Sequence, residues 1–195
     1  MRGAALPLLD AEDLVIFESF FSHGFGLPTS IFFCRVLEFY QIDLVNLNPN
    51  SILHLSIFSH FCEAFLGIPP HFGLFKYLFY LIVQNVRGEP KVIGGAGFQF
   101  EEGRKKFYLD YSLPTSNKGW HSQSFYYNNP APSLPTNYNS IPASSQAWRA
   151  VPTGRELMEV KELLKIIEEA MKSGITGARV AMNFLHHQLQ LFIPL

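Results

Sequence analysis

The most regular run of apolar positions lies between Asn48 and Leu66. Its apolar side chains recur at steps of three and four residues, the period of a helix buried on most of its circumference. Asn48 or Asn50 can cap the start of this helix, Gly67 suits a left-handed C-cap, and Pro69 forbids its continuation. We predict that this helix is the centre of the fold, and that four of its side chains are largely inaccessible. These four are Phe58, Phe61, Cys62 and Phe65.

The same period predicts three further helices, over residues 11–23, 29–41 and 72–81. Asp10 precedes the first, and acidic residues in its first turn complement the helix dipole. Pro28 or Thr29 can open the second.

From Gly88 onward the period shortens and aromatic residues alternate with polar ones. Residues 98–100, 107–111 and 120–127 are predicted to be strands, with a hairpin turn at residues 101–103. Three short strands are stable only when their apolar face packs on something. We therefore predict a small three-stranded antiparallel sheet that packs on the helices.

Residues 128–147 are rich in Pro, Ser and Asn, a composition typical of a linker. Trp148 follows, and a long helix starts at Thr153 or Gly154 and ends at Lys172. Thr176 can cap a last helix. Both helices have one apolar face, which must be covered by the body or by another chain. We favour self-association through this helix pair.

These elements predict an α+β protein with a mainly helical N-terminal body, a three-stranded sheet and a C-terminal helix pair. The expected divisions are a body with the sheet over residues 10–128, a linker over 129–147 and the helix pair over 148–192.

Composition changes this picture in only a few respects. The 195 residues include 19 Phe, and the net charge is -1, so the basic surplus typical of nucleic-acid binders is missing. If nucleic acid binds, we expect the contacts on one face of the sheet. The candidate residues are Arg104, Lys105, Lys106, Lys118 and Trp120.

Two features bear on the compartment. Cys34 and Cys62 lie in separate apolar helices, which predicts two buried free thiols in an intracellular protein. The apolar run over residues 72–83 is shorter than a membrane span and contains Lys76, so no membrane association is expected.

No catalytic or metal-binding signature can be identified. The sequence contains no Asp-Thr/Ser-Gly tripeptide of an aspartic protease, and Asp110 has no adjacent Asp of the kind found in reverse transcriptases. His54, His60 and Cys62 point in different directions on a helix, so they cannot share a metal. We predict no catalytic residues, no metal and no cofactor. Glu63, the one charge deep in the apolar helix, is expected to be paired or at the rim of the core.

A carboxylate set for integrase-type chemistry can also be written down. It would combine Asp43, Glu63 and Asp110, but the parallel strands that such a site needs are not indicated by the pattern.

Several segments resemble a known plant family, the "putative gypsy-type transposon" domain of retrotransposon-derived reading frames. They include residues 20–28 (FFSHGFGLP), 62–71 (CEAFLGIPPH), 94–99 (GGAGFQ) and 174–177 (GITG). The resemblance extends from about Leu14 to Gln190, and residues 62–79 are its most specific part. It implies a retrotransposon origin and supplies no catalytic residues.

The chain departs from that family at two places. Relatives tend to have Trp where Phe72 or Phe75 stands, and a basic pair near the end where this chain has His186-His187. Relatives also continue into charged, coiled-coil-prone sequence. We therefore expect a non-catalytic protein-association module; the alternative is a nucleic-acid-binding or transposition-related protein.

Overall fold

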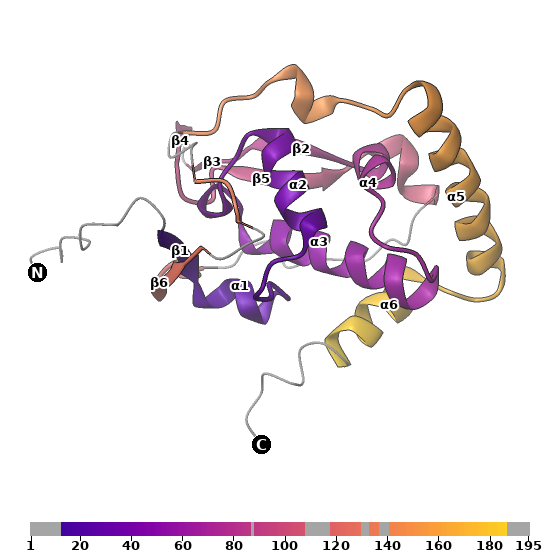
Figure 1. Cartoon of the computed structure of the whole chain (residues 1–195), viewed down its shortest axis with the longest axis horizontal. Helices are drawn as coiled ribbons and strands as arrows, with labels where there is room; N and C mark the ends of the chain where they lie inside the picture. The colour runs from indigo at the N-terminus through magenta and orange to yellow at the C-terminus, as the bar shows by residue number, and fades with distance from the viewer. Residues whose placement is uncertain (1–12, 87, 108–117, 130–132, 137–140, 187–195) are drawn as a thin grey trace, which may run out of the picture.

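The computed structural model describes residues 13–86, 88–107, 118–129, 133–136 and 141–186. Helix α3, Pro49–His60, runs through the middle of the molecule (Figure 1). Its N-cap is Asn48, whose side chain accepts a hydrogen bond from the amide of Ser51. The helix continues as a π-helical turn, η2 (Phe61–Phe65), and Gly67 follows with a φ of 66°. The central helix is therefore confirmed, with Asn48 rather than Asn50 as its cap.

Five other helices surround α3 in the described part of the chain. They are α1 (Glu18–Ser22), α2 (Ile31–Tyr40), α4 (Phe72–Leu78), α5 (Gly154–Lys172) and α6 (Gly177–Phe184). α1 and α6 contact α3 directly, and α5 packs on α4 at the edge of the molecule (Figure 1). α2 begins after Ser30, whose side chain accepts a hydrogen bond from the amide of Phe33. Pro28 as the first residue of this helix is therefore wrong by three residues, and Thr29 as its cap is wrong by one.

The strands described form three separate antiparallel pairs. β1 (Asp13–Phe17) pairs with β6 (Ser124–Asn128), and β2 (Phe79–Val83) pairs with β5 (Ala96–Phe100). A two-residue ladder joins β3 (Asn85–Val86) to β4 (Glu89–Pro90). The α+β class is confirmed, whereas the three-stranded sheet is wrong.

Two strands lie where helices were expected. The predicted helix over residues 11–23 is helical only from Glu18, because residues 13–17 are the strand β1. The predicted helix over residues 72–81 ends at Leu78, and β2 begins at the next residue. Both segments contain β-branched residues, which favour a strand once a partner strand is present.

The predicted strands after Gly88 have mixed outcomes. Residues 98–100 lie in β5, and the strand expected over 120–127 begins only at Ser124. Glu102–Phe107 forms a 3-10 segment, η3, in place of the expected hairpin turn. The rest of the strand expected over 107–111 lies outside the described residues.

One apolar core is built largely from aromatic rings. Phe58, Phe61 and Cys62 are fully buried, as predicted, whereas Phe65 is only half-buried. Phe58 packs between the rings of Phe32 and Phe75, at centroid distances of 5.5 and 5.3 Å. Both cysteines are buried, as predicted. No helix in the described ranges has the length and apolar character that crossing a bilayer requires.

The C-terminal helices pack on this core. Val160 and Ile167 of α5, and Val180 and Phe184 of α6, are buried. Between the body and α5, the indole Nε1 of Trp148 donates to the carbonyl of Tyr40 at 3.1 Å. The apolar faces predicted from the sequence are therefore covered by the body of the same chain. The division at residues 129–147 stays a prediction.

Candidate functional site

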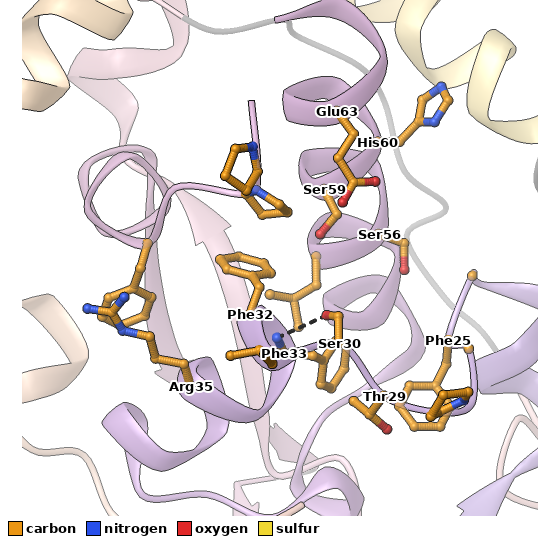
Figure 2. Close-up of a pocket in the computed structure, with 18 of the residues that line it drawn as sticks. Phe25, Thr29, Ser30, Phe32, Phe33, Arg35, Ser56, Ser59, His60 and Glu63 are labelled. Carbon is orange, nitrogen blue, oxygen red and sulfur yellow. Dashed lines mark hydrogen bonds between the residues drawn. The ribbon is translucent and has the colours of Figure 1, made fainter. Parts of the chain in front are cut away.

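A cavity of about 580 Å³ lies between α2, α3 and the Pro69-Pro70 turn. We call it the α2–α3 groove. Figure 2 shows it with the side chains of both helices. Its lining comes from the segment before α2, the first turns of α2, the second half of α3, η2 with the residues that follow it, and the end of α6. The lining residues used below are Phe25, Ser30, Ile31, Phe32, Phe33, Arg35, Ser56, Ser59, His60, Glu63 and Phe72.

The groove exists because α3 ends in an irregular way. In η2 the amide of Leu66 bonds to the carbonyl of Phe61, and the amide of Ile68 bonds to that of Cys62. The two prolines that follow end the helix and line the groove, and the chain then returns to α2 at Phe72, whose ring lies against the guanidinium of Arg35. The space left between the two helices is the groove.

The floor of the groove is aromatic and fixed. Phe25 and Phe33 pack edge to face at 5.3 Å, and Phe32 stacks on Phe58 at 5.5 Å. All four rings are buried in the core. Rings held in this way offer an apolar surface that does not have to rearrange when a side chain is placed against it.

The rim is polar, but part of it is already engaged. Ser30 caps α2, and the hydroxyl of Ser56 donates to the carbonyl of Ile52 at 2.9 Å. Ser59 of α3 and Glu63 of η2 point toward the space between the helices (Figure 2). Glu63 is exposed, which confirms the expectation that it lies at the rim of the core.

The two charges of the rim have opposite sign. Arg35 lies on the α2 side, with its guanidinium carbon 4.8 Å from the centroid of the Phe72 ring. Glu63 lies on the α3 side. A ligand of the groove would therefore meet a cation at one edge and an anion at the other.

The groove does not assemble a nucleophile and base from these residues. The His60 ring points away from Glu63 toward α6 (Figure 2), where its Nε2 lies 2.8 Å from Oδ1 of Asn183. Ser59 and His60 are adjacent on α3, so their side chains diverge by about 100°. His60 thus ties α3 to α6, and we assign it a structural role.

The other histidines of the apolar half also have separate surroundings. His54 lies between the rings of Phe79 and Phe100, and burial lowers its pKa to about 3. Nδ1 of His71 accepts a hydrogen bond from the amide of Leu74 at the start of α4. Burial also raises the pKa of the Cys62 thiol to about 12, so this sulfur is a poor nucleophile and a poor metal ligand. In the described segments, no three His, Cys, Asp or Glu side chains gather closely enough to hold a metal ion.

The residues proposed for nucleic acid are distributed over different elements. Arg104 stacks on the Tyr77 ring at 4.2 Å and donates to the carbonyl of Tyr77, so it lies against α4. Trp120 packs against Phe17 and Phe20, on β1 and α1. Lys118 is exposed. The structure thus brings Arg104 and Trp120 against different parts of the body.

The other two proposed lysines directly follow Arg104 in the chain. Lys105 and Lys106 belong to η3, but their side chains lie outside the described part of the structure. The nucleic-acid site as a whole stays a prediction.

Sequence reasoning singled out Glu63 but missed the groove. Ser30 and Arg35 lie on α2, about 30 residues before Glu63, and no pattern in the sequence links them to it. The available signal was local: a single charge on an apolar helix, followed at once by Gly67 and two prolines, marks a place where that helix has to end beside a neighbour.

The comparisons with known proteins concern the segment that builds this groove. Residues 15–83 match a family model described as "Putative gypsy type transposon". Searches of curated proteins and of solved structures found no match to the chain. The matched residues include the end of β1, the helices α1 to α4 and β2, and therefore nearly all of the groove lining. This match, which covers about a third of the chain, supports a gypsy-type transposon-derived domain over residues 15–83.

Proposed function

We propose that this chain is a non-catalytic protein-association module that binds a short segment of another protein in the α2–α3 groove. The observation that carries the proposal is the groove itself: a rigid aromatic floor, an open polar rim and rim charges of opposite sign. Peptide-binding grooves commonly combine an apolar floor, which supplies affinity, with a few polar groups that fix direction.

The lining also indicates the chemistry of the bound segment. Its centre should be one or two apolar side chains that lie on the Phe25–Phe33 floor. A basic residue on one side would pair with Glu63, and an acidic residue on the other would pair with Arg35. Ile31, 77% exposed beside the groove, adds apolar surface to the same edge.

Selection from a displayed library of random 12-residue peptides on the immobilised full chain tests this proposal. We expect enrichment of peptides with an apolar pair next to a basic residue. Ser59→Trp should fill the groove and abolish their binding, whereas Met158→Ala, on the outer side of α5, is the matched control and should leave it unchanged.

The charge variant gives a sharper readout than loss of binding. Glu63→Lys should shift the selected flanking residue from basic to acidic, which a variant that merely loosens the fold cannot do. If the Ser59→Trp variant selects the same peptides as the unmodified chain, the groove is not the binding surface.

Nucleic-acid binding is the alternative, and the same protein preparation can test it. A labelled 20-nucleotide single strand should bind weakly, because the net charge is -1. Tight binding that is lost when Arg104, Lys105 and Lys106 are replaced by Ala would favour the alternative over peptide binding.

A further inference from the structure

The two faces of α5 differ in what covers them. Its inner face is held to the body through buried Val160 and Ile167 and through Glu156, whose Oε2 accepts a hydrogen bond from Nζ of Lys76 at 2.8 Å. The helix lies along the edge of the molecule (Figure 1), with its other face turned away from the body. That outer face carries two large exposed apolar side chains, Met158 at 69% and Ile166 at 51%.

The outer face is self-complementary about Glu162. Glu159 and Lys165 lie three residues before and after Glu162, and Met158 and Ile166 lie four residues before and after it. Seven residues away on either side stand Arg155 and Glu169. Steps of three, four and seven residues return to the same side of a helix. Each pair thus joins two apolar side chains or two opposite charges.

We propose that α5 pairs antiparallel with α5 of a second copy of this chain, around a two-fold axis at Glu162. A two-fold contact places each residue opposite the one equally far from the axis on the other side. Met158 then lies against Ile166 of the second copy, and Arg155 lies against Glu169 of the second copy. Both contacts occur twice.

The charges select this arrangement over a parallel one. In a parallel pair each residue meets itself, so Arg155 would face Arg155 and Glu169 would face Glu169. Like charges opposite each other destabilise helix pairs, and opposite charges specify orientation. Within each copy Arg155 already pairs with Glu159 at 3.0 Å and Glu169 with Lys172 at 2.9 Å, so the contacts between copies extend these exposed ion pairs. Glu162 lies opposite itself, and its intrachain contact with Lys165 at 2.8 Å partly neutralises that repulsion.

The contact is small, so the association should be weak. A helix of 19 residues is about 28 Å long. One such helix pair buries less surface than the roughly 1,200–2,000 Å² of a stable complex, and only two apolar residues per copy lie in it. We expect a concentration-dependent monomer–dimer equilibrium. This surface is separate from the α2–α3 groove, so the inference does not depend on the function proposed there.

Sedimentation equilibrium of the full chain over a wide range of concentrations tests the proposal. Arg155→Glu or Glu169→Arg alone should weaken dimerisation at least tenfold, because each places like charges opposite each other twice. The double variant Arg155→Glu/Glu169→Arg should recover the unmodified affinity. Glu162→Gln should strengthen the dimer, since it removes the repulsion at the axis.

Mixing provides the decisive control for folding. A one-to-one mixture of the Arg155→Glu and Glu169→Arg chains should form heterodimers, although neither chain pairs with itself. A chain that stays monomeric at about 1 mM, or single variants that dimerise as well as the unmodified chain, would overturn the proposal.

Discussion

Lys76 is the charge that holds α5 on the body. Its side chain is 10% exposed, and its Nζ lies 2.8 Å from Oε2 of Glu156. The same ammonium group lies 5.0 and 5.1 Å from the ring centroids of Phe39 and Phe72. Glu156, in the first turn of α5, is less enclosed, with 32% of its side chain exposed. The two partners of this ion pair thus differ in their access to water.

This difference predicts unequal costs for removing either partner. Removing one member of a buried ion pair costs about 3–5 kcal/mol, because the other charge is left uncompensated. Glu156→Ala leaves a nearly buried cation, but cation–π attraction from two rings offsets about 1 kcal/mol of that cost, so we expect about 2–4 kcal/mol. Lys76→Met keeps the volume of the stem and leaves a carboxylate that water can reach, so we expect a loss of at most about 1 kcal/mol.

Urea unfolding followed by tryptophan fluorescence gives these free energies, and a double-mutant cycle isolates the interaction between the two residues. We expect Lys76→Met to recover part of the cost of Glu156→Ala, because no buried charge then remains. Lys165→Met removes one member of an exposed pair and is the matched control, with an expected change within about 0.5 kcal/mol. A larger loss in Lys76→Met than in Glu156→Ala would refute the reasoning, since it would show that packing of the lysine stem matters more than its charge.

Three further changes should be visible in the same unfolding assay. Phe61→Ala should lower the free energy of unfolding by about 3–5 kcal/mol, because the ring is fully buried; an unchanged midpoint would place the core elsewhere. Gly24→Ala should cost about 2 kcal/mol or more, since φ is 90° and a Cβ would lie 2.5 Å from Cζ of Phe184, whereas Gly26→Ala should be neutral because that Cβ would meet nothing within 4 Å. Because the pKa of His54 is lowered in the folded state, the unfolded chain binds more protons than the folded chain between pH 6.5 and about 3. The free energy of unfolding should therefore fall as the pH falls through that range, and it should fall less steeply in His54→Met.

The parts of the fold that the sequence predicted depend on local chemistry. An Asn before Pro49, a glycine at position 67 and Thr176 each satisfy or end a helix through atoms a few residues away. Such contacts can be predicted without the rest of the structure, because both partners lie in the same short segment. The starts of α3 and α6, and the end of the helical segment that α3 and η2 form, were therefore visible in the sequence.

The errors occur where the partner is distant in the sequence. Residues 13–17 fit a helical stripe as well as a strand, and their strand conformation depends on β6, more than 100 residues later. β2 likewise depends on β5, since Leu81 is opposite Phe98. Local period cannot decide between two elements when pairing supplies the deciding hydrogen bonds.

The candidate site, too, depends on contacts between residues that are distant in the sequence. Glu63 attracted attention because it is a charge among apolar neighbours, and it does lie at an exposed edge. What makes that edge a groove is the approach of α2, and the facing residues Ser30 and Arg35 have no sequence feature that links them to Glu63. A single residue of a site can thus be found by its local anomaly, whereas the site itself follows only from packing.

From the sequence, the apolar faces of the C-terminal helices could be covered by the body or by another chain. In α5 the two contacts are compatible, because they use different faces of the helix. Its apolar stripe, centred on Val160 and Ile167, is covered by the body. The outer face of α5 has too little apolar surface to bind another chain by burial alone. In the proposed dimer its charged residues, Arg155 and Glu169, pair with those of a second copy. Docking within the chain is then governed by burial and the Lys76–Glu156 pair, whereas association between chains is governed by charge. Raising the salt concentration should therefore weaken association between chains much more than the docking of α5 on the body, because salt screens exposed ion pairs much more than partly buried ones.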